Sequence, residues 1–202
     1  MSQIRRFTHS LPILLSLAAL QACSSREDSG AANTASAGPS ASAETSAVPS
    51  MTPDDIRALA MRMNDLAQKP RLQHEIGWTI TSRQGTGADA NADQYLAQYS
   101  EGGDCFSDWS VVRRNGEPVL FTHYSGCAVE SYPREFQDDS IFLDKGKAIG
   151  GTSSTITVMG EDQPNKVKSK PLTDAAAVKR ALRIATGLVA LDTALLNKAA
   201  FE

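Results

Sequence analysis

Two stretches of the chain carry apolar residues at the spacing of an amphipathic helix. The first follows Thr52-Pro53-Asp54-Asp55, where a hydroxyl cap, a first-turn proline and two acidic residues favour a helix start. Pro70 is predicted to end this helix. Thr173 is predicted to cap the second, a long helix near the C-terminus with a broader apolar stripe. That stripe comprises Val178, Leu182, Ala185, Leu188, Val189, Leu195 and Leu196.

Between these helices, shorter segments alternate apolar and polar residues with the period of a β-strand. Ile76, Trp78 and Ile80 predict a first strand, and later strands are predicted at 140–143 and 155–159. These later strands are expected to be separated by turns at Lys145-Gly146 and Gly150-Gly151.

The segment from Arg83 to Asp104 is polar and contains several glycines. It is predicted to be irregular, with a short helix around Tyr95, Leu96 and Tyr99.

The strongest local signal is Asn115-Gly116, because this pair tolerates the positive φ angles of a tight hairpin turn between the strand-like sequences on either side. A two-residue turn sets Cys105 opposite Gly126, whereas a three-residue turn or one bulge sets Cys105 opposite Cys127. Pro118 is expected at a strand start or on an edge, because proline cannot donate to a ladder.

The predicted order is a helix, then several strands, then a helix, and strands do not alternate regularly with helices. This order predicts an α+β fold for residues 51–202, taken as a single globular domain. We expect a small antiparallel sheet that contains the hairpin and packs against an N-terminal helix and a long C-terminal helix.

The first 22 residues have the layout of an export signal. Arg5 and Arg6 precede an apolar run at 11–20, which is shorter than the roughly 20 residues that a membrane-spanning helix needs. The sequence Leu20-Gln21-Ala22-Cys23 resembles the lipobox of bacterial lipoproteins, with leucine three residues before the cut, a small residue before it, and then the cysteine. The resemblance covers the signal segment alone.

This resemblance implies that residues 1–22 are removed and that Cys23 carries a diacylglyceryl thioether and an amide-linked acyl chain. Three acyl chains make a durable anchor, since each buried methylene contributes about 0.8 kcal/mol and a single chain holds marginally. Ser24 replaces the aspartate that marks inner-membrane retention in this family, which favours the outer membrane, facing the periplasm. The segment 23–50 is dominated by Ser, Ala, Gly, Thr and Pro, and is predicted to be a disordered tether.

The charge distribution argues against a nucleic-acid partner. The whole chain has a net charge of −3, and loss of the two signal arginines brings the mature chain near −5. The basic residues are scattered and form no polybasic run. No dinucleotide or phosphate-loop motif is present, so no cofactor is expected.

Once Cys23 is acylated, Cys105 and Cys127 remain as a pair in an oxidising compartment, where a disulfide is the default. The chain-entropy relation gives this loop roughly 3.4 kcal/mol of stabilisation. The alternative is catalysis, because Asp104-Cys105 resembles the Asp-Cys of cell-wall cysteine peptidases, and His123 is then the candidate base. That family continues with Ser-Gly, where this chain has Phe106-Ser107.

Asp89, Asn91 and Asp93 place oxygen ligands at every second position, as a calcium loop does. Gln94 and Ser100 stand where such a loop requires glycine and glutamate. A solvated turn that caps a short helix is therefore the favoured interpretation, with calcium as the open alternative. His74 and His123 lack the spacing of a zinc pair, and no metal is expected.

The segments near Tyr95, Tyr99, Tyr124 and Tyr132 are the candidate interface, because amphipathic aromatic side chains are enriched where proteins meet. The sequence favours a non-enzymatic, protein-binding lipoprotein. Its most concrete form is an immunity protein that neutralises an incoming antibacterial effector, by analogy with small tethered periplasmic lipoproteins. The alternatives are an accessory lipoprotein of an envelope or secretion assembly and a cysteine-dependent cell-wall hydrolase.

Overall fold

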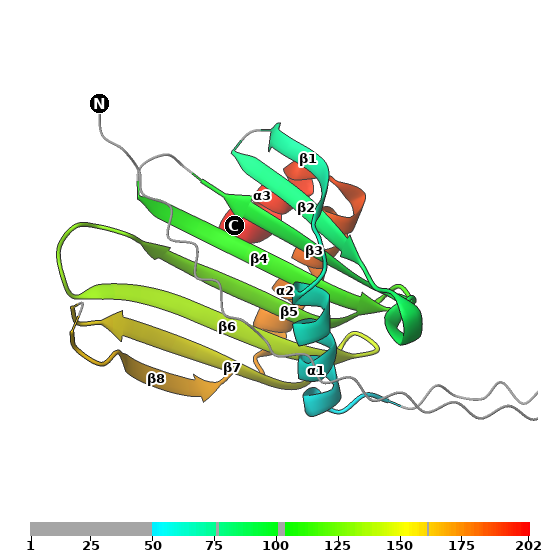
Figure 1. Ribbon diagram of the computed structural model, residues 1–202, viewed down its shortest axis with the longest axis horizontal. Coiled ribbons are helices and arrows are strands. Elements are labelled where there is room, and N and C mark those ends of the chain that lie inside the picture. The colour runs from blue at the N-terminus through cyan, green and yellow to red at the C-terminus, as the bar shows by residue number, and fades with distance from the viewer. Residues whose placement is uncertain (1–49, 76, 101–103, 161) are drawn as a thin grey trace, which may run out of the picture. The chain divides into compact units, whose positions relative to one another are not determined.

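One antiparallel sheet dominates the fold. The computed structural model describes residues 50–75, 77–100, 104–160 and 162–202, so the signal segment, Cys23 and the tether up to residue 49 lie outside the described residues. Each strand pairs with its neighbours in sequence, in the order β1 to β8 (Figure 1). The strands are β1 (Lys69–Glu75), β2 (Trp78–Gln84), β3 (Ala92–Tyr99), β4 (Cys105–Arg114), β5 (Glu117–Cys127), β6 (Arg134–Asp144), β7 (Lys147–Val158) and β8 (Lys166–Pro171).

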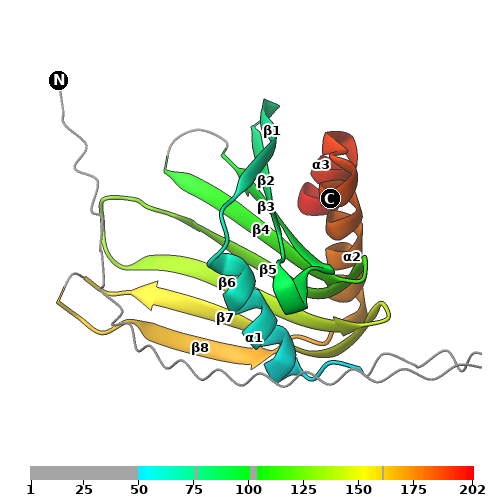
Figure 2. The same cartoon turned by 45° about the vertical axis from the view of Figure 1, so that its right-hand side comes forward.

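Helices lie on both faces of this sheet. They are α1 (Pro53–Asn64), the short 3-10 helix η1 (Gly87–Asp89), α2 (Ala175–Ala190) and α3 (Thr193–Phe201). Figures 1 and 2 show α1 crossing one face, while α2 and α3 lie against the other. We call the face that carries α1 the front face and the opposite one the back face.

The larger core lies between the back face and α2 and α3. Alternate residues in part of β2, β3 and β4 point into it, as the strand period requires. The sheet contributes Trp78, Ile80, Tyr95, Ala97, Trp109, Val111, Phe121, Ile141 and Leu143. The helices contribute Ala181, Ile184, Ala185, Leu188, Leu196, Ala199 and Ala200. Each large apolar side chain buried here contributes roughly 1.5–3 kcal/mol.

A smaller core lies under α1 on the front face. Ile56, Leu59 and Met63 point from the helix and are fully buried. They pack on Ala92, Val112, Leu120 and Phe142 of the sheet. The helix begins with the predicted cap: the backbone N–H of Asp55 donates to Thr52 Oγ1 over 3.2 Å, and the carboxylate of Asp55 accepts from Thr52 N over 3.1 Å. Four of the seven residues of this core come from near the hairpin turns, so α1 covers one part of the front face.

The predicted hairpin is confirmed, with the register that aligns the two cysteines. Asn115 and Gly116 adopt φ angles of 53° and 81°, and a bulge after Val112 shifts the ladder by one residue. Cys105 consequently stands opposite Cys127, and a disulfide joins them with Cα atoms 3.9 Å apart. The two-residue turn with one bulge therefore decides between the registers that the sequence left open.

The sheet is larger than predicted, and one predicted helix is wrong. Tyr95, Leu96 and Tyr99 belong to β3, whose backbone pairs with β2 and β4 along its length. The sequence did not indicate this strand, because polar residues such as Asp93, Gln94 and Gln98 interrupt the apolar alternation, although Gln94 is buried in the sheet. The edge strands β1 and β8 were also missed, and all six residues of β8 are exposed.

Gly150 and Gly151 do not form the predicted turn, because both lie inside β7, opposite Phe142 and Ile141. The residue at 151 faces the chain that leaves β8. A Cβ atom there would lie 2.2 Å from Leu172 O and 2.8 Å from Ser140 O. Glycine at 151 therefore permits close backbone contact within the sheet.

The C-terminal helix is interrupted, whereas one long helix was predicted. Leu191 adopts a left-handed conformation with φ 56°, which ends α2, and Asp192 then caps α3 by accepting from Leu195 N over 2.9 Å. The cap of α2 is Asp174 and not Thr173. The first helix ends at Asn64, and Pro70 lies in the edge strand β1, where a missing donor is tolerated.

Candidate functional site

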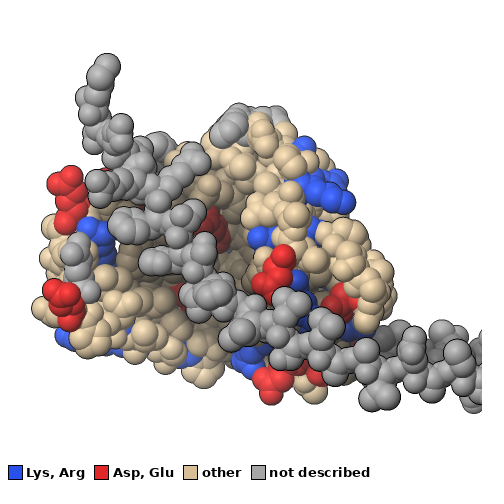
Figure 3. Space-filling model, in the orientation of Figure 1, with Lys and Arg blue, Asp and Glu red and all other residues tan. Residues whose placement is uncertain are grey.

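The front face is hollowed where α1 does not cover it (Figure 3). A pocket of about 270 Å³ lies there over β2 to β5. We call it the sheet pocket, and its polar and aromatic lining includes Thr79, Thr81, Gln98, Asp108, Ser110, Thr122 and Tyr124. Acidic atoms are visible inside the hollow in Figure 3.

The strand register brings these side chains together in two rows. Thr79, Gln98, Asp108 and Tyr124 are successive cross-strand partners in the first row, which we call the Asp108 row. The second row, Thr81, Leu96, Ser110 and Thr122, runs two residues further along each strand. Residues two apart on one strand share a face, so hydroxyl groups of three strands point into one pocket.

A hydrogen-bond network separates the sheet pocket from α1. Gln94 is 3 % exposed, and its Nε2 donates to Ser110 Oγ and to Asn64 Oδ1, each over 3.0 Å. Arg83 donates to Gln94 Oε1 over 2.8 Å. These contacts fix the position of Ser110 at the wall of the pocket and join it to the end of α1.

Asp108 is the most unusual group in the sheet pocket. Its Oδ1 atom is buried and has no hydrogen-bond partner among the described residues. Burial raises the pKa of Asp108 above its ordinary value of 3.8, although a hydrogen bond with Gln98 opposes the shift. A buried carboxylate oxygen without a partner costs stability, and such groups concentrate at functional sites.

The carboxylates of Asp108 and Asp138 lie near Tyr124. Burial raises the pKa of its phenol, and the charges of Asp138 and Asp108 raise it further. Asp138 is the cross-strand partner of Tyr124 on β6, and its own pKa is raised by burial and by Asp139. No lysine or arginine lines the sheet pocket among the residues that the structure describes. The pocket therefore carries negative charge without a counter-ion from the described part of the chain.

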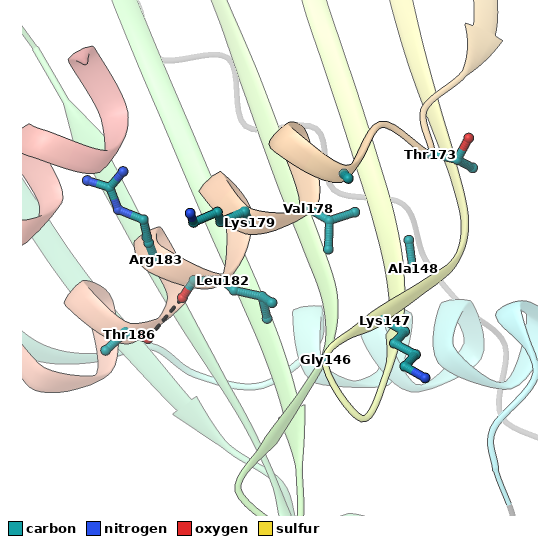
Figure 4. Close-up of a pocket in the computed structure, with 10 residues that line it drawn as sticks. Gly146, Lys147, Ala148, Thr173, Val178, Lys179, Leu182, Arg183 and Thr186 are labelled. Atoms are coloured by element: carbon teal, nitrogen blue, oxygen red, sulfur yellow. Dashed lines mark hydrogen bonds between the residues drawn. The ribbon is translucent and has the colours of Figure 1, made fainter.

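Two other cavities lie along α2 and have a different character. One, of about 570 Å³, lies between α2 and the β6–β7 turn, and Figure 4 shows Val178 and Leu182 pointing toward that turn. Lys179 and Arg183 extend away from Lys147, so their charges do not converge (Figure 4). The neighbouring cavity, of about 420 Å³, is also walled by Leu182. Both offer a mostly apolar surface along α2, and the second also has Arg113 and Glu117 in its wall.

The proposed pairing of Cys105 with His123 is not present. The sulfur of Cys105 is held in the disulfide, and His123 lies opposite Trp109, four residues further along β4. The imidazole stacks on Trp109 at 5.0 Å between ring centroids, and its Nδ1 lies 3.9 Å from Asp139 Oδ2. Burial lowers the pKa of His123 below 6.5, so this ring is neutral at pH 7.

The three candidate calcium ligands are engaged separately. Asp89 accepts two hydrogen bonds from Arg62, and Asp93 accepts two from Arg113. Asn91 donates to Asn115 over 2.6 Å. Within the described ranges, no three His, Cys, Asp or Glu side chains are grouped so that they can hold a metal ion.

The four candidate interface tyrosines are not brought together. Tyr95 is 6 % exposed on the back face, and Tyr99 packs there against Trp78 at 5.1 Å between ring centroids. Tyr132 is 40 % exposed beside Arg134, whereas Tyr124 is 37 % exposed and lines the sheet pocket. Of the four, only Tyr124 belongs to the candidate site.

Sequence reasoning missed the other polar residues of the pocket. The signal that was available was the alternation in β2, where Thr79 and Thr81 interleave with Trp78 and Ile80. Asp108 and Ser110 flank Trp109 in the same way. The cross-strand register was needed to show that these separate alternations meet.

Comparison with known proteins does not assign the chain to a family. Among the described residues, no helix is long and apolar enough to cross a bilayer. Comparisons of the chain with protein-family models, with curated proteins and with solved structures find no match.

Proposed function

We propose that this protein is a lipid-anchored binding module of the outer membrane that faces the periplasm and captures a protein partner with the sheet pocket. The anchor is inferred from Leu20-Gln21-Ala22-Cys23. The binding surface is inferred from one observation: the front face keeps a polar and aromatic hollow in which a buried oxygen of Asp108 has no partner among the described residues.

The chemistry of the hollow favours recognition of a partner. Hydroxyl, amide and carboxylate groups supply directed hydrogen bonds, and Tyr124 supplies an amphipathic ring of the kind enriched at interfaces. These groups stand on paired strands, so their positions are fixed before a partner arrives. A preorganised surface loses less conformational entropy on binding than a mobile loop does.

In its most concrete form, this module is an immunity protein that binds and neutralises an antibacterial effector in the periplasm. An accessory role in an envelope or secretion assembly uses the same surface with a different partner. We do not retain the cysteine-dependent hydrolase, because Cys105 is disulfide-bonded and distant in register from His123.

Site-specific photo-crosslinking in the cells that produce the protein tests this proposal. A benzophenone amino acid at Thr122, in the sheet pocket, is expected to give a discrete adduct with one partner protein. The same residue at Glu135 provides the control, because Glu135 is exposed on β6 and points to the opposite face. Equal adducts at the two positions, or adducts from Glu135 alone, contradict the proposal.

The identity of the cross-linked partner then separates the two versions. A toxin that is inhibited by the purified lipoprotein supports the immunity role. A component of the cell envelope supports the accessory role. Mass spectrometry of the adduct distinguishes these outcomes.

A further inference from the structure

The protein already contains one site that holds an arginine between a carboxylate and a tyrosine. On the back face, Arg113 Nε donates to Asp93 Oδ1 over 2.8 Å. The guanidinium carbon of Arg113 also lies 5.0 Å from the ring centroid of Tyr95. The guanidinium donates to the carboxylate while it lies over the ring of Tyr95, and its Nη2 also donates to the Tyr95 hydroxyl over 3.4 Å, so these interactions form together.

The sheet pocket presents the same two partner types without the arginine. Asp108 and Tyr124 are cross-strand partners on β4 and β5, and both line the pocket. The buried Oδ1 of Asp108 has no hydrogen-bond partner among the described residues. Tyr124 is braced by Phe136, which stacks at 5.9 Å between ring centroids, and Tyr124 remains 37 % exposed.

The remaining lining suits the other donors of a guanidinium, which carries five N–H groups and no acceptor. Hydroxyl oxygens of Thr81, Ser110 and Thr122 form the second row of the pocket, and each can accept a hydrogen bond. Asp138 adds a second carboxylate beside Tyr124 through the β5–β6 pairing. The lining therefore offers several hydrogen-bond acceptors together with the carboxylate of Asp108, and Asp138 lies next to Tyr124 outside the lining.

The size of the pocket restricts the occupant. Its volume of about 270 Å³ falls below the roughly 300–1,000 Å³ of cavities that hold drug-sized ligands. A single long side chain that projects from a protein surface matches this volume better than a whole cofactor does. Arginine is also among the residues most enriched at energetically dominant contacts between proteins.

We infer that the sheet pocket is a receptor for an arginine side chain of the partner, held between the carboxylate of Asp108 and the ring of Tyr124. This inference rests on the proposed function, because it names the group by which the partner is recognised. Charge complementarity selects a cation, and the pairing of a carboxylate with an aromatic ring selects guanidinium over ammonium.

Three dye-labelled tripeptides test the inference with the full-length acylated chain in detergent. Their central residue is arginine, lysine or citrulline, and fluorescence anisotropy reports binding. Citrulline keeps the shape of arginine and removes its charge. We expect the arginine peptide to bind at least 10-fold more tightly than either of the other two.

Variants locate the binding site. Asp108→Asn and Tyr124→Leu are each expected to weaken binding of the arginine peptide at least 10-fold. Glu135→Gln is the matched control, because it removes one carboxylate from the opposite face and is expected to leave binding unchanged. Unfolding curves of each variant establish that it is folded.

The outcomes separate this inference from the function on which it rests. The arginine receptor is overturned if the arginine peptide does not bind, or if it binds no more tightly than the citrulline or the lysine peptide. It is also overturned if Asp108→Asn leaves binding of the arginine peptide unchanged. A cross-link from Thr122 that persists alongside any of these results retains the binding face and removes only its arginine specificity. Loss of the cross-link from the front face removes the proposed function itself.

Discussion

At the scale of single residues, Asp108 shows a conflict between stability and a candidate role. Burial raises the pKa of this carboxyl in the folded protein above the ordinary value of 3.8. The folded state therefore keeps the proton to a higher pH than the unfolded chain does. Stability consequently falls as pH rises from about 3.8 through the raised folded pKa. The stability that the protonated carboxyl contributes is therefore lost once Asp108 ionises.

Replacing this carboxyl with an amide is expected to stabilise the protein at neutral pH. Asp108→Asn removes the buried charge and keeps the size of the side chain, so its urea midpoint at pH 7 is expected to exceed that of the parent chain. The difference is expected to shrink as the pH is lowered toward 3.8, where the carboxyl of the parent becomes protonated. Tryptophan fluorescence follows both unfolding curves, because Trp78 and Trp109 are buried.

The exposed carboxylate of Glu135 provides the control for this comparison. Glu135→Gln is expected to change the midpoint little at either pH, since exposed substitutions typically stay within about 0.5 kcal/mol. A destabilised Asp108→Asn at both pH values contradicts the interpretation, because it assigns Asp108 a structural role.

At the scale of elements, the hairpin of β4 and β5 positions half of the sheet pocket. Its turn, its bulge and its disulfide specify one register, and that register aligns Asp108 with Tyr124 and Ser110 with Thr122. A slip by one residue reverses which side chains face the front. The disulfide closes a loop with a sequence separation of 22, which corresponds to roughly 3.4 kcal/mol of stabilisation on the chain-entropy relation.

Two adjacent glycines in β7 give a matched pair for testing the packing of an element. Gly151→Ala is expected to destabilise the protein by about 1–3 kcal/mol, because the new Cβ clashes with backbone oxygens that cannot rotate away. Gly150→Ala meets only Phe142 at 3.7 Å and is expected to be neutral or stabilising by up to about 1 kcal/mol. Urea unfolding of the two variants measures the difference, and equal effects contradict this assignment of the close backbone contact.

At the scale of the whole molecule, the domain is proposed to work at a distance from the membrane. For the proposed disordered tether over 23–50, ~5–6 Å multiplied by the square root of its length gives a root-mean-square reach of about 30 Å. In this proposal, that reach keeps the front face accessible to a periplasmic partner, and acyl chains on Cys23 hold the protein at the membrane.

Substitution of Cys23 tests this arrangement. Cys23→Ala is expected to abolish incorporation of a palmitate analogue and to move the protein out of the membrane fraction, because the acyl chains have lost their attachment site. Ser24→Asp is the paired variant and is expected to keep the acyl label while shifting the protein to the inner membrane. Membrane association of Cys23→Ala equal to that of the parent chain contradicts the proposed anchor.

Local sequence by itself determined the features that depend on a few neighbouring residues. The cap at Thr52, the turn at Asn115-Gly116 and the disulfide of Cys105 with Cys127 were predicted and are confirmed. The antiparallel sheet with helices was predicted too, although its extent was not. The cap and the turn follow from side-chain capping and backbone φ preference within a few residues, and the disulfide follows from thiol chemistry between the two cysteines that the hairpin brings together.

Tertiary structure alone decided the extent of the sheet and the composition of its pocket. The segment that forms β3 was predicted to be irregular with a short helix, because the stretch around it is polar and rich in glycine, and pairing on both sides makes it a strand. Asp108 becomes part of a pocket only because residues of other strands lie beside it. The burial of its Oδ1 atom is likewise a property of the assembled sheet. Cross-strand register joins positions far apart in sequence, so no local pattern contains that information.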